Sequence, residues 1–494
     1  MKEIKTTTNK RHSAFFEPLI IFICALIVIT VCSKCSVLYP LNDWDDANCF
    51  FTVGKAMMNG KVLYRDIFEQ KGPVLYMLHG IAWEISHNTF IGIYLLEIIC
   101  CFVFLYFSHR TMKLFSDKRI IIAVVPLSAF VYTSLAFCSG DSAEELCLPM
   151  LAYVFYTAME RIKSGGKLKL TQMLFCGICT GIMLWIKFTV LGFIIGFAAA
   201  FVILYIRQKE YLHILKCSIA MIAGIIIASI PVIAYFIRTD SFSYLWDVYF
   251  YDNMFLYSGG IELPPVIKQA ANLLWGLLSF AMYNTFGLLM LAAAFYRVIK
   301  KESKTLIFVF SAIVISGFFF SFIGGRAYAY YSLSMSVFAP VGAVQIYDVV
   351  KNKLNISNSK KRYFAAVCVL SLLVTVFMCR NTYTLFTDKD DMPQFRFNNI
   401  ISQKNNAKLL NYGFLDGGFY TVSGTIPECR FFCGLNIELP ELKETQDEYI
   451  NSGRADFVVT KDKKLRSENY RLADSCKFRY WSENSIYYLY ERKN

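Results

Sequence analysis

The sequence predicts an all-α polytopic membrane protein that carries a small α/β domain at its C-terminal end. Of the 494 residues, 56% are hydrophobic and only 18% are charged, which is more apolar surface than a soluble domain of this length can bury. Apolar runs recur through the first 380 residues, and most are long enough to cross about 30 Å of hydrocarbon as a helix. Basic residues gather in the short links between these runs.

The expected spans follow one another closely along the chain. They cover residues 18–39, 90–107, 119–138, 217–236, 273–296, 305–323 and 363–379, with a hairpin of two spans at 170–206. The pattern predicts about eleven transmembrane helices in all. The apolar stretch 74–86 is too short to cross alone, which suits an interfacial or re-entrant helix.

The net charge of +13 reflects topology rather than a nucleic-acid partner. Of the 50 Lys and Arg residues, 24 lie in the N-terminal segment 2–11 and in five links between spans. Under the positive-inside rule these links face the cytoplasm, and so does the N-terminus. The loops that alternate with them then face outward at the cell membrane, and they are residues 40–89, 139–144, 237–272 and 324–331.

A change in composition near residue 380 divides the chain into two expected domains. Residues 1–380 form the transmembrane domain with its outward loops. Residues 381–494, called the tail below, contain no 18-residue apolar run. The segments "RADFVVT" and "SIYYLYER" are rich in β-branched and aromatic residues and predict strands. The tail is therefore expected to be an extracytoplasmic α/β domain.

The sixteen cysteines carry no metal signature. Most lie in apolar runs, where a thiol behaves as a small hydrophobic group. Cys429 and Cys433 lack the second pair that a zinc site needs. A disulfide of these residues with each other or with Cys476 is the alternative to free thiols outside the membrane.

Three carboxylates follow the first expected span directly: Asp43, Asp45 and Asp46 in "LYPLNDWDD". A carboxylate in the interfacial zone loses hydration, which raises its pKa and suits a general base. The alternative is a solvated cap that keeps the first helix from sliding into lipid. The spacing alone leaves both interpretations open.

Two basic residues close the same loop, in "YRDIFEQKGP". Arg65 and Lys71 lie where the chain turns back to the membrane, so they are placed to clamp a phosphate, Arg in bidentate fashion and Lys as a point charge. An ordinary salt-bridged loop would use the same residues.

A second outward loop, "CSGDSAEELCLP", carries Glu144 and Glu145. Adjacent carboxylates without a basic neighbour repel each other unless a cation or a substrate group lies between them. The same letters also make a good helix start, in which the acids complement the helix dipole.

Two isolated cations complete the outward face. Lys187 in "LWIKFTVLGF" has apolar neighbours on both sides, and Arg326 in "FIGGRAYAYYSL" precedes a tyrosine cluster. Such cations need an anionic partner, for which a lipid phosphate is the natural candidate. Snorkelling to headgroups explains each of them individually.

Taken in order, these motifs resemble those of the bacterial GT-C glycosyltransferases, the superfamily of the protein O-mannosyltransferases and the aminoarabinose transferases of lipid A. "DDANCFFTVGKAMMNGKVLYRDIFEQKGPVLYML" resembles the family's first outer loop, and its Asp falls on Asp46 with Asp45 beside it. "SGDSAEELCLP" is similar to the family's "GGNxTEE…LP", which places the paired acids on Glu144 and Glu145. "GGRAYAYYSL" resembles "GGRPYPHYYL", with Tyr330 where a His is common.

The resemblance implies a GT-C-like fold and an inverting glycosyltransferase that moves a sugar from a polyprenyl-phosphate donor to a cell-envelope glycan, lipid or protein. It implies that Asp46, or Asp45, is the general base. The donor phosphate would be held by Arg65, Lys71, Lys187 and Arg326. Glu144 and Glu145, with Tyr330, would order the acceptor or an ion. The metal requirement stays open between no cofactor and a divalent cation such as Mg²⁺ or Mn²⁺.

The alternative from another class is a lipid or polysaccharide transporter or flippase. Transport favours charges near mid-membrane and paired, broken-helix halves. The sequence offers Glu97 as a nearly intramembrane charge and shows no internal repeat. A membrane scaffold would leave the acids of the outward loops unexplained. The glycosyltransferase interpretation requires these acids and cations to surround one outward cavity.

Overall fold

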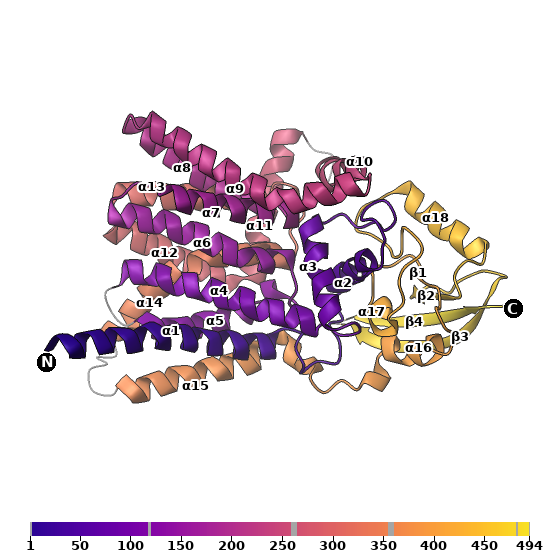
Figure 1. Ribbon diagram of the computed structural model, residues 1–494. Coiled ribbons are helices and arrows are strands. Elements are labelled where there is room, and N and C mark those ends of the chain that lie inside the picture. The colour runs from indigo at the N-terminus through magenta and orange to yellow at the C-terminus, as the bar shows by residue number, and fades with distance from the viewer. Residues whose placement is uncertain (1, 117–119, 258–263, 354–359, 481–482, 494) are drawn as a thin grey trace.

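The computed structural model describes residues 2–116, 120–257, 264–353, 360–480 and 483–493. Long helices form a bundle, and the tail lies at one end of it, with the N-terminus at the opposite end (Figure 1). The bundle contains α1 (Lys2–Cys32), α4 (Ile91–Phe115), α5 (Val124–Tyr132), α6 (Ala143–Ser164), α7 (Leu170–Ile186), α8 (Gly192–Arg207), α9 (Tyr211–Arg238), α11 (Pro265–Tyr283), α12 (Thr285–Lys301), α13 (Lys304–Phe322), α14 (Ala339–Lys353) and α15 (Lys360–Met378).

The helices confirm a multi-pass membrane protein. Among the described residues, five helices are long and apolar enough to cross a membrane, or six if α11 and α12 form one bent span. Shorter apolar helices add further candidates, at Phe16–Cys32, Ile120–Tyr132, Leu170–Ile186 and Arg362–Met378. The expected number of about eleven spans stays a prediction.

The segment expected as one continuous span at 273–296 is instead broken at Asn284. The axes of α11 and α12 meet there at 106°. The Asn284 side-chain oxygen accepts a hydrogen bond from the backbone N–H of Gly287 at 3.0 Å, which caps α12. Its amide nitrogen donates to the carbonyl of Ser332 at 3.0 Å. The asparagine therefore ends one helix, starts the next and ties both to the segment η5 (Ala329–Phe338).

The first long loop folds into two short helices, α2 (Asp45–Met58) and α3 (Pro73–Ile85), which pack on each other at the tail end of the bundle (Figure 1). The helices approach closely where a glycine of one faces a glycine of the other. A Cβ on Gly54 would lie 2.5 Å from the backbone nitrogen of Gly80. The short apolar segment 74–86 thus forms the short helix that was expected, and it supports α2.

The tail contains a four-stranded sheet in the order β1-β2-β4-β3. Its strands are β1 (Leu409–Asn411), β2 (Phe457–Lys461), β3 (Tyr470–Tyr480) and β4 (Glu483–Arg492), accompanied by helices α16 (Pro393–Ile401), α17 (Phe419–Ser423) and α18 (Pro440–Asn451). β1 pairs with β2 in parallel, and the other two pairings are antiparallel. The two predicted strands correspond to β2 and β4. β3, in which charged residues interrupt the apolar ones, was not predicted.

Buried polar contacts fasten the tail to α2. Thr52 donates a hydrogen bond to Asp416 at 2.6 Å, and the Lys55 ammonium donates to the backbone carbonyl of Tyr420 at 2.7 Å. The Thr421 hydroxyl donates to the Asn48 side-chain oxygen at 2.9 Å. All of these groups are buried, so losing one partner would leave an unsatisfied polar group. The tail therefore fixes the position of the helix that begins with Asp45 and Asp46.

A thiol pair also crosses this contact and can test it. All sixteen cysteines lie in the described residues and are free thiols. The sulfurs of Cys49 and Cys433 are 3.9 Å apart and buried. We expect mild oxidation with copper phenanthroline to join Cys49 to Cys433, because the sulfurs are already in contact. Peptide mapping by mass spectrometry under non-reducing conditions would detect the linked peptide.

The matched controls for this cross-link are single serine variants. Cys433→Ser should abolish the linked peptide, whereas Cys429→Ser and Cys476→Ser should leave it in place. A disulfide between Cys429 and Cys433, or one to Cys476, would contradict the observed docking of the tail on α2.

Candidate active site

Asp46 lies at the start of α2 and is in contact with the segment η5. The Tyr330 hydroxyl donates a hydrogen bond to Asp46 Oδ2 at 3.0 Å. The Tyr330 ring packs edge-on against Trp44, the residue that precedes α2, at a centroid distance of 5.3 Å. Asp46 is buried, and its place in the first helical turn lets the dipole of α2 stabilise a negative charge. The site thus holds a carboxylate in a fixed orientation.

The neighbouring acids are directed elsewhere. Asp43 forms a buried ion pair with Lys34, with 2.6 Å between Nζ and Oδ1. Asp45 is half-buried. Its electrostatic neighbours include Lys461 and Asp416 of the tail as well as Asp46 and Asp43. Of the three acids after the first span, Asp46 is the one that accepts a hydrogen bond from η5 within the described residues.

Lys187 and Glu144 form a buried ion pair next to Tyr330. Lys187 lies in extended backbone between α7 and the short helix η3 (Phe188–Leu191). Its ammonium lies 3.7 Å from the ring centre of Tyr331 and 5.4 Å from that of Tyr330. One oxygen of Glu144 has no hydrogen-bond partner among the described residues. A continuous series of contacts therefore joins Asp46, through Tyr330 and Lys187, to Glu144.

Two further cations meet on the ring of Tyr257. The Lys71 ammonium is 5.9 Å from its centre, and the guanidinium carbon of Arg326 is 4.8 Å from it. Lys71 also lies 3.9 Å from a carboxylate oxygen of Glu69. Burial alone would lower the pKa of Lys71, but the adjacent charges of Glu69 and Asp46 outweigh it and raise the pKa, so the ammonium stays charged.

Arg326 also reaches from the bundle to the tail. Its guanidinium donates long hydrogen bonds, of 3.3–3.4 Å, to the carbonyl of Tyr257, the hydroxyl of Tyr328 and the carbonyl of Asn436. None of these partners carries a negative charge, so the Arg326 cation keeps its capacity to bind an anion.

Arg65 lies apart from these groups. Its guanidinium pairs with the adjacent Asp66 at 2.8 Å, and it donates to the carbonyl of Thr239 at 3.1 Å. The Arg65 side chain is 39% exposed. Shared aromatic and carboxylate neighbours thus bring Lys71, Lys187 and Arg326 together with Asp46, whereas Arg65 contacts Asp66 and Thr239 instead.

Glu145 points away from Glu144, into a separate buried network. The backbone N–H of Asp141 donates to Glu145 Oε2 and to Glu97 Oε1, both at 2.9 Å. The Ser33 hydroxyl donates to Glu97 at 2.6 Å, and His79 Nε2 lies 2.9 Å from Asp141 Oδ1. All five side chains are 0% exposed. The network links Ser33, which directly follows α1, with α3, α4 and α6.

Sequence reasoning missed Tyr257, Tyr331 and Trp44 as parts of the site. The clustering of aromatic residues near outward loops was visible, but aromatic residues are common at membrane interfaces. These three residues differ from the other aromatic residues because each one covers a charged or polar side chain. That contact is visible only in the folded structure.

The described residues contain no group of three or more His, Cys, Asp and Glu side chains that could hold a metal ion. One carboxylate oxygen of Glu144 lacks a hydrogen-bond partner within the described part of the chain. A divalent cation at this carboxylate stays a prediction.

The raised pKa of Asp45 predicts how the stability of the folded protein depends on pH. Burial, together with the charges of Asp46, Asp416 and Asp43, raises this pKa to about 7, while Lys461 partly opposes the shift. An unfolded Asp has a pKa of about 3.9. The folded state therefore binds the proton more tightly, so the stability falls as the pH rises from about 4 to about 7.

We expect Asp45→Asn, which cannot ionise, to be more stable than the wild type at pH 8 by about 2 kcal/mol. The difference should shrink as the pH falls through 7 and vanish near pH 4. Thermal unfolding in detergent across this range would measure it. A stability difference that is the same at every pH would contradict the prediction.

No protein-family model and no curated protein matches this sequence. Solved structures do match its fold. ArnT from Cupriavidus metallidurans bound to undecaprenyl phosphate aligns over 95% of this chain and 97% of its own, with a TM-score of 0.59 and 10% sequence identity. The apo form of ArnT aligns over 97% of this chain and 98% of its own, with a TM-score of 0.55 and 9% identity. The chain therefore has an ArnT-like fold, and the resemblance to GT-C proteins is confirmed at the level of fold.

Proposed function

We propose that this protein is an inverting glycosyltransferase that moves a sugar from a polyprenyl-phosphate donor to a cell-envelope acceptor at the outer face of the cell membrane. The observation that carries the proposal is the single cluster of Asp46, Glu144 and three cations, next to η5 and the start of α2. The fold likeness to a protein crystallised with undecaprenyl phosphate supports the choice of donor.

Each group in the cluster has a role in this reaction. The Asp46 carboxylate takes the proton from the acceptor hydroxyl, and the freed oxygen attacks the anomeric carbon from the face opposite the phosphate. The bond between that carbon and the phosphate oxygen breaks, with inversion. The phosphate leaves with an additional negative charge, which Lys71, Lys187 and Arg326 stabilise. Tyr330 orients Asp46 through its hydrogen bond.

The remaining residues are assigned from their contacts. Glu144, one oxygen of which has no hydrogen-bond partner among the described residues, is placed to order the acceptor or a divalent cation. Glu145 has its role in the buried network rather than at the acceptor. Arg65 contributes to donor binding less than the other cations, because its contacts with Asp66 and Thr239 hold it apart from the cluster. The tail, residues 381–494, is proposed as an outward domain that fixes α2, and the N-terminus is placed in the cytoplasm.

The test is a transfer assay with purified protein in vesicles. A panel of radiolabelled polyprenyl-phosphate sugars is supplied with a cell-envelope extract as acceptor. The proposal expects loss of label from one donor, release of polyprenyl phosphate and label in the extract. A transporter would instead carry the intact donor across the vesicle membrane. Movement of donor without cleavage would overturn the proposal.

A further inference from the structure

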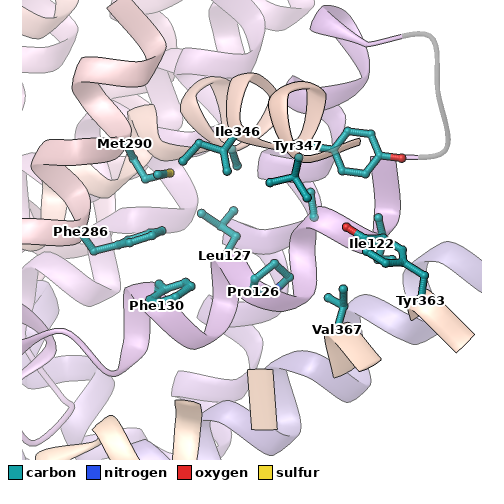
Figure 2. A pocket seen from close by; sticks show the side chains of 13 residues that line it. Ile122, Pro126, Leu127, Phe130, Phe286, Met290, Ile346, Tyr347, Tyr363 and Val367 are labelled. Carbon is teal, nitrogen blue, oxygen red and sulfur yellow. The ribbon is translucent and has the colours of Figure 1, made fainter. Parts of the chain in front are cut away.

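An apolar groove lies within the bundle, formed by α5, α12, α14 and α15 (Figure 2). The groove encloses about 150 Å³. One wall is formed by the stacked rings of Phe130 and Phe286, whose centroids are 4.3 Å apart. Figure 2 shows Leu127 and Ile346 between this wall and the far end. Apolar cavities of this size stay dry and accept apolar ligands.

The groove is separate from the Asp46 cluster. Tyr363 and Val367, which line it, lie near the start of α15, whereas the tail follows the end of that helix at Met378. At 1.5 Å per residue, Tyr363 is about 20 Å along the helix axis from Met378. The groove therefore lies toward the end of the bundle that is opposite the tail, as the course of α14 and α15 shows (Figure 1).

A short helix leaves the groove unfilled. The apolar helical segment Ile120–Tyr132, which includes α5, spans only about 20 Å, less than the roughly 30 Å of the hydrocarbon core. α15 packs on α5, while α14 packs on α12. The space between these two pairs is lined by side chains from all four helices. In a bilayer, lipid chains surround such a position.

Polar groups gather at one end of the groove. Tyr347 and Tyr363 lie there with their hydroxyl groups (Figure 2). Lys351 follows Tyr347 by one turn on the same face of α14, and Arg362 is exposed at the start of α15. The nearby acid, Asp348, is already paired with Arg297 at 2.9 Å and Lys301 at 3.7 Å. This end therefore favours an anionic group.

We propose that the groove binds one acyl chain of an anionic glycerophospholipid, with the lipid phosphate against Tyr347, Tyr363 and Lys351. The apolar groove accounts for the chain, and the tyrosine hydroxyls with the basic residues account for the headgroup. This lipid fills the space between the α5–α15 and α12–α14 pairs and stabilises the bundle. The inference is independent of the proposed transferase activity.

The test titrates delipidated protein in detergent with dioleoylphosphatidylglycerol and, separately, with dioleoylphosphatidylcholine. Native mass spectrometry counts bound lipid, and thermal unfolding follows its effect. One phosphatidylglycerol should bind per chain and raise the melting temperature, with a clear preference over phosphatidylcholine. Equal binding of the two lipids, or no bound lipid, would overturn the proposal.

Three variants test the site directly. Ala343→Phe places a ring in the groove and should abolish the bound lipid, whereas Ala366→Phe, the same change at an exposed position of α15, should not. Lys351→Gln should weaken phosphatidylglycerol binding about fivefold and leave phosphatidylcholine unchanged. Equal lipid binding by the two Phe variants would show that the lipid does not bind in the groove. An unchanged affinity in Lys351→Gln would refute the headgroup assignment.

Discussion

Asp46→Asn is expected to lower the rate of sugar transfer by about 10²–10⁴-fold, which is the usual contribution of a general base. The amide keeps the size of the carboxylate and still accepts the hydrogen bond from Tyr330. It cannot take a proton from the acceptor hydroxyl. The loss should therefore appear in kcat, while KM for the polyprenyl-phosphate donor stays close to the wild-type value. Steady-state kinetics in vesicles would measure both.

The matched change at Asp45 separates two adjacent candidates. Asp45 faces the tail, and Asp46 is bound by Tyr330. A large loss of kcat in Asp45→Asn, with transfer intact in Asp46→Asn, would reverse the assignment.

Tyr330→Phe keeps the ring contact with Trp44 but removes the hydroxyl. Its effect should be smaller than that of Asp46→Asn, because the base remains and only its orientation is lost.

Much of the fold could be predicted from the sequence because a bilayer imposes long apolar helices and basic links. The break at Asn284 could not be predicted in this way. A single asparagine in an apolar run is compatible with a continuous helix, and only its partners Gly287 and Ser332 show that it caps one. The contact between the Cys49 and Cys433 thiols could not be predicted either, because it depends on the docking of the tail on α2.

The sequence predicted which residue types form the candidate site, but not the direction in which each side chain points. Glu144 and Glu145 are adjacent in sequence, yet successive residues on a helix point about 100° apart. One therefore meets Lys187 and the other meets Asp141. Which of them faces the site depends on how α6 is rotated in the bundle, and packing against the neighbouring helices decides that rotation. The same argument applies to Asp45 and Asp46 on α2.

The second large effect is expected from the buried pair of Lys187 and Glu144. Lys187→Met should lower the free energy of unfolding by about 3–5 kcal/mol, because it leaves the Glu144 carboxylate buried without its cation. Glu144→Gln should have a cost of similar size for the converse reason. In Lys187→Met/Glu144→Gln neither charge remains, so the double variant should be more stable than the sum of the single changes predicts.

Unfolding in detergent, measured for the wild type and all three variants, gives the coupling energy directly. Arg396 and Asp474 provide a matched control, because they form an ion pair at 2.7 Å whose arginine is 49% exposed. Arg396→Met should change the stability by less than about 1 kcal/mol. A coupling energy near zero for Lys187 and Glu144 would show that the pair is not desolvated. If Lys187 also holds the donor phosphate, the double variant recovers stability but not transfer, since no cation returns to the site.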